Sequence, residues 1–162
     1  MICIDGPMGS GKTTLAGALA REVGGAIVHM DDLYGGWDGI DRAWPRLVSS
    51  VLTPLRAGHA AAVRTFDWSA GGFTGPVTRI ESGRPVIAEG CGSAPRLADG
   101  VAQLIVWVDA ALPVRLARVA RRDGPAQSEN LRAWAVSEAV HYAREGTRDR
   151  ADVIVRTDVP PA

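Results

Sequence analysis

The 162-residue sequence contains a single lysine, because 17 of its 18 Lys and Arg residues are arginine. Arginine occupies the positions where any surface cation would serve. Lys12 therefore stands where a compact ammonium group on a flexible stem is required. The lack of a second lysine also leaves no Asn-Lys-x-Asp segment, the usual guanine-recognition element of GTP-operated switches, and this disfavours that class of protein.

Cysteine is scarce and long hydrophobic runs are absent. Cys3 and Cys91 are the only cysteines, which is too few for a disulfide framework, and their separation does not match metal-ligand spacing. No apolar run reaches transmembrane length, and the N-terminal residues resemble a strand more than a signal peptide. Acidic and basic residues balance at 18 each, so no broad basic field indicates a nucleic-acid or membrane partner. We therefore expect one cytoplasmic domain over residues 1–162.

Residues 6–13 fit the phosphate-loop (Walker A) pattern G-x-x-x-x-G-K-[ST] at every fixed position. The glycines let successive backbone N–H groups point into one hollow that binds phosphate oxygens. Lys12 is expected to reach the β- and γ-phosphates, and the Thr13 hydroxyl to ligate Mg²⁺. An apolar run precedes the loop and helical periodicity follows it, which is the context that the motif requires. The candidate nucleotide-binding residues are Gly6, Gly9, Ser10, Gly11, Lys12, Thr13, Thr14 and Arg122.

Other apolar segments predict strands at residues 26–30, 84–88, 104–108 and 151–155, with a short extended segment at 61–66. Helices are predicted at residues 44–56, 112–122 and 128–144, and a short helix or turn at 77–82. Strands that alternate with helices in this way predict a three-layer αβα fold with a five-stranded parallel sheet.

Carboxylates follow two of the predicted strands. Asp31 and Asp32 come directly after residues 26–30, and Glu89 comes after 84–88. Open α/β sheets bind ligands at the carboxyl ends of their strands. Asp31 is therefore a candidate general base and water-mediated magnesium contact, and Glu89 a second magnesium-side acid. A solvated turn and a turn cap are the structural alternatives. Neighbours on an extended chain point to opposite sides, so only one of the two aspartates is expected to face a substrate.

Six of the nine aromatic residues lie between residues 34 and 73, in a region of about residues 31–75 predicted to form loops on the acceptor side. They would form either a small hydrophobic core under a long loop or a wall that stacks a flat acceptor. These residues are Tyr34, Trp37, Trp44, Phe66, Trp68 and Phe73.

Arg115, Arg118 and Arg122 recur at spacings that place them on one face of the helix predicted at residues 112–122. A polar hinge at residues 123–125 and a second helix follow. This arrangement indicates a phosphate-closing lid over about residues 115–130. An ordinary solvated basic face is the alternative.

The chain resembles the uridine kinase-like branch of the P-loop nucleoside and nucleotide kinases over most of its length. The resemblance is carried by the phosphate loop, by Asp-x-x-Tyr from Asp31 to Tyr34, by the triplet at residues 66–68, by Glu89 and by Arg-x-x-Arg from Arg115. It implies a sheet ordered 2-3-1-4-5, with ATP and Mg²⁺ as phosphoryl donor and a small hydroxyl-bearing molecule as acceptor.

The loop motif assigns roles to Lys12 and Thr13, the aromatic cluster to Tyr34, Trp37 and Trp68, and the resemblance to the remaining site residues. Catalysis would fall to Lys12, Asp31, Arg115 and Arg118; metal binding to Thr13, Asp31 and Glu89; and acceptor binding to Asp31, Tyr34, Trp37, Phe66, Asp67 and Trp68, with Asp67 on a ribose. The family carries a His- and Arg-containing segment after the aromatic triplet, where this chain has Ser-Ala-Gly-Gly. The acceptor is therefore open: a nucleoside such as uridine, a nucleoside monophosphate clamped by Arg46, Arg64 or Arg79, or a non-nucleoside. A nucleotide-binding module without turnover is the alternative of another class.

Overall fold

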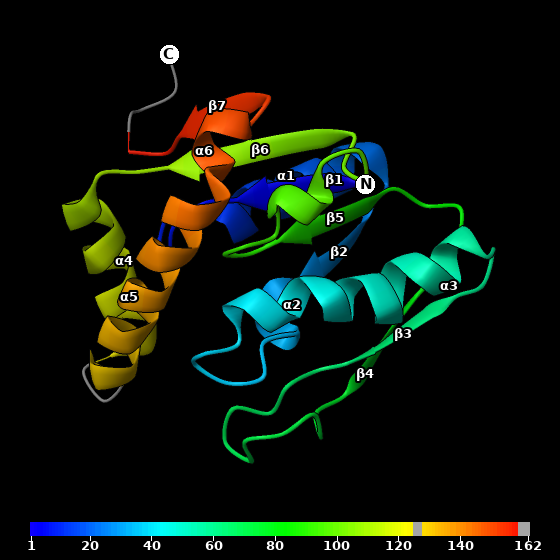
Figure 1. Cartoon of the computed structure of the whole chain (residues 1–162), viewed down its shortest axis with the longest axis horizontal. Coiled ribbons are helices and arrows are strands. Elements are labelled where there is room, and N and C mark those ends of the chain that lie inside the picture. Colours follow the sequence, from blue (N-terminus) through cyan, green and yellow to red (C-terminus); the bar gives the residue numbers. More distant parts are fainter. Residues whose placement is uncertain (125–127, 159–162) are drawn as a thin grey trace.

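The computed structural model describes residues 1–124 and 128–158 (Figure 1). Its main sheet consists of five parallel strands in the order β2-β5-β1-β6-β7. Numbered along the chain within this sheet, the order is 2-3-1-4-5, so the αβα fold class and the implied strand order are confirmed. The strands are β1 (Ile2–Asp5), β2 (Ala26–His29), β5 (Val86–Glu89), β6 (Leu104–Asp109) and β7 (Val153–Arg156).

The sheet separates two hydrophobic cores, because successive side chains of a strand point to opposite faces. Ile4 of β1 belongs to a core that is completed by the apolar face of α1 (Lys12–Val23). Its neighbour Cys3 belongs to the larger core on the other face, together with Trp44, Leu47 and Trp134 from helices. The carboxyl ends of β1, β2 and β5 therefore meet at one edge, with helices on both sides.

The helix predicted at residues 44–56 begins earlier, at Ile40. The structure has α2 (Ile40–Leu47), a π-helical turn (Val48–Leu52) and α3 (Thr53–Arg56) in direct succession. Pro45 thus lies inside the helix and not in its first turn. The buried stripe that begins with Ile40 and Ala43 extends the helix past the proline, because packing of an apolar face outweighs one missing hydrogen bond.

The prediction of a short helix or turn at residues 77–82 is wrong. Residues Val77–Ile80 form β4, which pairs antiparallel with β3 (Ala61–Arg64), while the extended segment predicted at 61–66 is confirmed. Three of the four residues of β4 are β-branched, which favours strand once a pairing partner is present. This two-stranded sheet lies below α2 and α3 in Figure 1, apart from the main sheet.

Two long helices, α4 (Leu112–Asp123) and α5 (Ser128–Glu145), lie side by side at the end of the sheet to which β6 leads (Figure 1). A short helix, α6 (Thr147–Arg150), follows and was not predicted. The predicted hinge extends to residue 125, which lies outside the described residues, as does the end of the chain at 159–162. Over the described ranges, none of the helices combines the length and the apolarity needed to cross a membrane.

Candidate active site

Three glycines of the phosphate loop, Gly6, Gly9 and Gly11, have positive φ, and at the first two a close backbone contact also excludes a side chain. Gly6 has a φ of 143° and Gly9 a φ of 80°. A Cβ atom on Gly6 would lie 2.2 Å from the Val108 carbonyl oxygen, and one on Gly9 would lie 2.6 Å from that of Arg115. Both positions combine positive φ with close backbone approach, so side chains are excluded there.

Side chains from α4 bind the carbonyl groups of this loop. Arg115 donates to the Met8 oxygen at 3.2 Å. Arg118 donates to the Gly9 oxygen at 3.2 Å and the Ser10 oxygen at 3.4 Å. Neither guanidinium lines the cavity described below, whereas Arg122 does. The three arginines therefore have different contacts in this structure. Arg115 and Arg118 bind the loop, and Arg122 faces the cavity.

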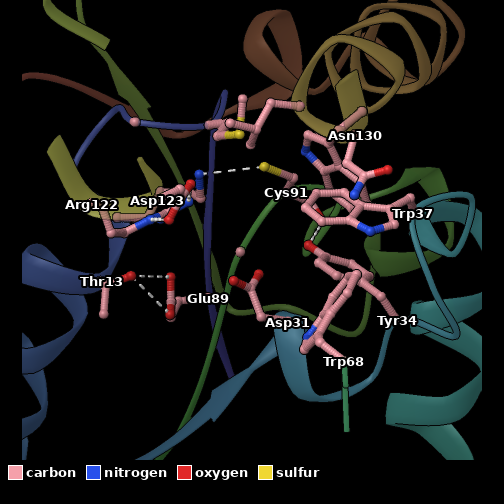
Figure 2. Close-up of a pocket in the computed structure, with 16 residues that line it drawn as sticks. Thr13, Asp31, Tyr34, Trp37, Trp68, Glu89, Cys91, Arg122, Asp123 and Asn130 are labelled. Carbon is pink, nitrogen blue, oxygen red and sulfur yellow. Dashed lines mark hydrogen bonds and ion pairs between the residues drawn. The ribbon is translucent and has the colours of Figure 1, made fainter. Parts of the chain in front are cut away.

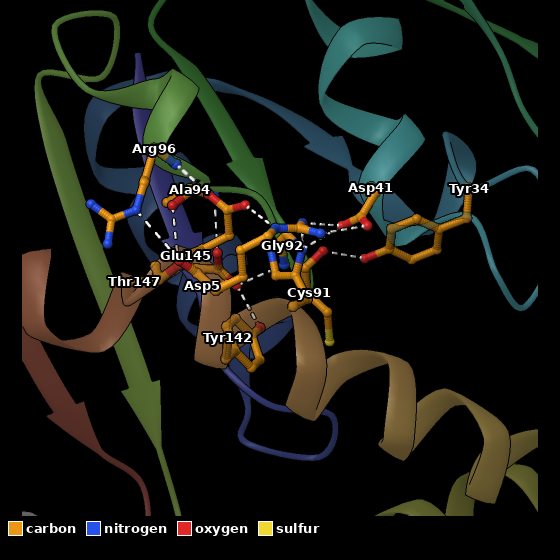
Figure 3. A network of polar contacts seen from close by, with 12 residues as sticks. Asp5, Tyr34, Asp41, Cys91, Gly92, Ala94, Arg96, Tyr142, Glu145 and Thr147 are labelled. Carbon is orange, nitrogen blue, oxygen red and sulfur yellow. Dashed lines mark hydrogen bonds and ion pairs between the residues drawn. The ribbon is translucent and has the colours of Figure 1, made fainter.

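Asp5, the last residue of β1, anchors the start of the loop. Its buried carboxylate accepts hydrogen bonds from the backbone N–H groups of Gly6, Gly92 and Ala94 and from the Tyr142 hydroxyl, at 2.7–2.9 Å (Figure 3). Burial raises the pKa of this carboxyl group, although the hydrogen bonds from Tyr142, Ala94 and Gly6 and the charge of Lys12 act in the opposite direction. The group joins the loop, the turn after β5 and α5.

Lys12 is buried at the foot of the loop. Its ammonium group donates to the carbonyl oxygens of Gly6 at 2.8 Å and Pro7 at 3.1 Å, and lies 3.5 Å from the Cys91 sulfur. The residue also lines the cavity. A charged, flexible group at this place can exchange its carbonyl partners for phosphate oxygens.

Thr13 and Glu89 provide oxygen atoms suited to magnesium. The Thr13 hydroxyl lies 3.2 Å from both carboxylate oxygens of Glu89 (Figure 2). The His29 imidazole forms a hydrogen bond with the Glu89 carboxylate, and this hydrogen bond raises the pKa of the imidazole. Hydroxyl and carboxylate oxygens are the ligands that Mg²⁺ prefers, and it commonly keeps several water ligands. The donor set therefore fits the ion. Within the described residues, no group of three His, Cys, Asp or Glu side chains is arranged as a metal site.

A cavity of about 490 Å³ opens at the carboxyl ends of the strands. Lys12 is among the residues that line it. Thr13, Glu89 and Arg122 line one side, and the Asp31 carboxylate lies between these residues and an aromatic side (Figure 2). Asp31 is reached by solvent through the cavity mouth, yet protein atoms surround much of it. That burial raises the pKa of Asp31; Lys12 acts in the opposite direction and Glu89 adds to the rise.

The aromatic side of the cavity is a chain of rings in contact. Trp37 lies 4.9 Å from Trp68 and 6.3 Å from Trp134, and Trp134 lies 4.7 Å from Tyr34, between ring centroids. The Tyr34 hydroxyl is fixed by a 2.6 Å bond to the Cys91 carbonyl oxygen. Of the acceptor residues expected from the sequence, Asp31, Tyr34, Trp37 and Trp68 thus reach the cavity.

Phe66 and Asp67 do not line the cavity. Phe66 packs against Trp68 and Phe73. The Asp67 carboxylate accepts the N–H groups of Ser69 and Ala70, both at 2.9 Å, and so stabilises its own loop. Of the candidate nucleotide-binding residues, four have no atoms lining the cavity: Gly6, Ser10, Gly11 and Thr14.

Sequence reasoning missed the contribution of α5, which lines the cavity with Asn130, Leu131 and Trp134. An available signal was the spacing of Trp134, Glu138 and Tyr142, which repeats every four residues and places them on one helix face. Met8, Gly90, Cys91 and Asp123 also line the cavity without having been singled out.

A phosphate loop after the first strand, a sheet ordered 2-3-1-4-5 and carboxylates at its carboxyl edge define a P-loop protein with the fold of the nucleoside and nucleotide kinases. Residues 2–136 match the sequence model of a family described as an AAA domain (AAA_18). Because that match spans most of the chain, the protein belongs to this family.

Solved structures with the same fold include several kinases. A possible uridine kinase from Bacillus stearothermophilus is 21% identical with a TM-score of 0.65, over 95% of this chain and 86% of its own. A putative fructose transport system kinase from Silicibacter sp. TM1040 is 17% identical (TM-score 0.53; 94% and 87%). Shikimate kinase from Acinetobacter baumannii, solved with shikimate, is 18% identical (TM-score 0.52; 98% and 83%). At these identities the likeness establishes the fold alone.

A tRNA dimethylallyltransferase from Cereibacter sphaeroides is 38% identical over 96 residues, which is 56% of this chain. The chain spans only 30% of the length of that protein.

Proposed function

We propose that the protein is an ATP-dependent phosphotransferase that moves the γ-phosphoryl group to a hydroxyl of a small molecule. One observation carries this proposal: a single cavity joins the Lys12 and Thr13 side of the phosphate loop to an aromatic side, with Asp31 between them. Phosphoryl transfer depends mainly on positioning and charge stabilisation, and both parts are available there.

In the proposed mechanism, Lys12 stabilises negative charge on the transferred group. Thr13 and Glu89, with Asp31 through water, would hold Mg²⁺, which would neutralise phosphate charge. Asp31 accepts the proton of the acceptor hydroxyl. Arg122 faces the cavity, while Arg115 and Arg118 act indirectly by holding the loop.

The charges around the cavity favour an acceptor that carries no phosphate. Among the described residues that line it, the cations are Lys12 and Arg122, and Arg122 is paired with Asp123 through two hydrogen bonds. The arginines considered for a second phosphate have other partners: Arg46 binds the Leu33 oxygen and lies over Phe73, Arg64 binds the Gly75 oxygen, and Arg79 binds Glu81. A neutral, ring-shaped alcohol suits the aromatic side best. A nucleoside such as uridine is the first candidate, and a non-nucleoside alcohol the second.

A panel of acceptors tests this proposal. Mg-ATP would be supplied with uridine, UMP, shikimate and neutral sugar alcohols, while ADP release and the phosphorylated product are followed by ³¹P NMR. Uridine or another neutral ring alcohol should be phosphorylated, and UMP and shikimate should react far more slowly. Preference for UMP would contradict the assigned acceptor class. Tight ATP binding with no product from any acceptor would favour a nucleotide-binding module without turnover.

A further inference from the structure

One carboxylate beside the phosphate loop has no part in the proposed transfer step. Glu138 of α5 is 7% exposed. Glu138 does not line the cavity, but it contacts Met8 and Cys91, which do. On the same face of α5, Trp134 packs against Tyr34, and the Tyr142 hydroxyl binds Asp5 and the Gly6 oxygen, both at 2.7 Å.

The contacts of Glu138 concentrate on the loop. Its Oε2 atom accepts the Met8 backbone N–H at 2.7 Å and the Cys91 thiol at 3.3 Å. Its Oε1 atom lies 3.9 Å from the Arg115 guanidinium, which in turn binds the Met8 carbonyl oxygen. Both polar groups of the Met8 residue are thus held from outside, one by α5 and the other by α4.

This arrangement fixes the third residue of the loop. A phosphate loop binds anions through backbone N–H groups held in one arrangement, so its affinity depends on how well that arrangement is prepared in advance. A buried N–H without a partner is costly, and the loop would shift to satisfy it if Glu138 could not reach. The 2.7 Å contact of Glu138 prevents that shift.

We propose that Glu138 is a positioning residue that holds the Met8 amide and so keeps the phosphate loop in its nucleotide-binding shape. The proposal rests on the proposed function only in that the loop binds a nucleotide; it requires no particular acceptor and no turnover. It also makes α5 the element that serves both sides of the cavity, because Trp134 lies one turn before Glu138.

Two substitutions distinguish the effect of the length of the Glu138 side chain from the effect of its charge. Glu138→Asp keeps the charge but shortens the side chain by one methylene, so it loses the Met8 N–H. Glu138→Gln keeps the length and an accepting oxygen but loses the charge. Glu129 lies in the first turn of the same helix and is exposed, so Glu129→Asp and Glu129→Gln are matched controls.

The experiment measures, on the full chain, the Kd for the magnesium complex of the non-hydrolysable analogue AMP-PNP by calorimetry. It also measures hydrogen exchange of the Met8 amide by NMR. Glu138→Asp should raise the Kd about tenfold and speed Met8 exchange at least tenfold, because the amide loses its partner. Glu138→Gln should keep both within about threefold of the parent, and neither Glu129 variant should change them. Thermal unfolding of each variant confirms that binding is measured on folded protein.

Two results would overturn the proposal. A Kd unchanged in Glu138→Asp, even with a lower unfolding temperature, would make Glu138 a purely structural residue. A raised Kd in Glu138→Gln together with an unchanged Kd in Glu138→Asp would show that the charge of the side chain, and not its length, determines nucleotide binding. Because AMP-PNP binding needs no acceptor, a protein that phosphorylates nothing would contradict the proposed function and leave this test intact.

Discussion

At the residue scale, the position of Asp31 is the feature that matters most. Asp31 and Asp32 lie in a 3₁₀ turn (Met30–Asp32) and not on the extended chain that the sequence suggested. Asp31 lines the cavity and Asp32 does not, while the Asp32 carbonyl oxygen accepts the N–H of Phe66 at 3.0 Å. The expectation that only one of the two aspartates faces the cavity is therefore met, but through the 3₁₀ turn and not through the alternation of side chains on an extended chain.

Asp31→Asn should lower turnover by roughly 10²–10⁴, the usual contribution of a positioned base, because the amide cannot accept the hydroxyl proton. Asp32→Asn is the matched control and should cost clearly less. Steady-state kinetics on both variants measures the effect, and calorimetric Mg-ATP binding checks that the site is intact. Greater damage from Asp32→Asn, with ATP binding retained, would show that the base is misassigned.

Trp68→Ala should raise the KM for the acceptor and leave ATP affinity unchanged. Trp68 is 41% exposed and lines the cavity, so its removal takes away stacking surface, worth about 1 kcal/mol or roughly fivefold, without opening the core. Phe66→Leu is the control, because Phe66 packs against Trp68 but does not reach the cavity. Equal acceptor KM values in the parent and Trp68→Ala would make Trp68 a structural residue of the loop.

At the element scale, an ionic contact joins α5 to α2, which follows the loop that carries Tyr34 and Trp37. The Asp41 carboxylate binds His141 Nδ1 at 2.7 Å and takes two hydrogen bonds from Arg144, at 2.6 and 3.0 Å (Figure 3). Arg144 first, and then His141, lower the pKa of Asp41 from 3.8 to about 2. The contact fixes α5 relative to α2, and so supports the packing of Trp134 on α5 against Tyr34 in the segment before α2.

Asp41→Asn should destabilise the protein at pH 6–7 by up to about 1 kcal/mol, because its side chain is half exposed and water screens the pair. A carboxyl group with a depressed pKa stabilises the fold above its unfolded pKa, near 3.8, and loses that effect as the pH falls through about 2. The difference in unfolding free energy between parent and variant should therefore shrink from pH 4 downward.

Urea unfolding at pH 6.5, 4 and 3 measures that difference. Asp38→Asn is the control, because Asp38 is exposed and its ion pair within the described part of the chain is a 3.4 Å contact with Arg42. A difference that stays constant over this range would mean that Asp41 acts through packing and not through its charge.

At the scale of the whole molecule, Arg118 joins the beginning of the chain to its end. Its guanidinium binds the Gly9 and Ser10 oxygens of the phosphate loop and both the hydroxyl and the carbonyl oxygen of Thr157, after β7. The Thr157 hydroxyl also donates to the Ser10 oxygen at 2.6 Å. The last strand of the sheet thereby supports the loop between the first strand and α1.

Arg118→Ala should lower the unfolding temperature by roughly 2–8 °C, as expected for a loss of about 1–2 kcal/mol in a chain of this size. It should also raise the KM for ATP, because the loop loses support. Arg121→Ala, which removes an exposed arginine of the same helix, should change neither quantity by more than experimental error. A normal KM and unfolding temperature in Arg118→Ala would show that the loop is held without this residue.

The sequence by itself determined the class of fold and the donor side of the site. Local chemistry was sufficient there: the loop motif needs Gly6, Gly11, Lys12 and Thr13 in fixed order within one segment, and the apolar strands around it sort into a parallel sheet. The carboxylates Asp31 and Glu89 were predictable for a related reason, because strand ends of a parallel sheet must meet at one edge.

Tertiary structure alone decided the rest of the site. Trp134 and Glu138 lie in a helix about 100 residues from Tyr34 and 130 residues from Met8 in sequence, and no local pattern specifies which loop a helix face will contact. The same is true of β4, which is a strand because β3 pairs with it, and of Asp67, whose own loop provides N–H groups that take its carboxylate. Motifs read along the chain located the phosphate loop, whereas the packing of α5 against it determined the shape of the cavity.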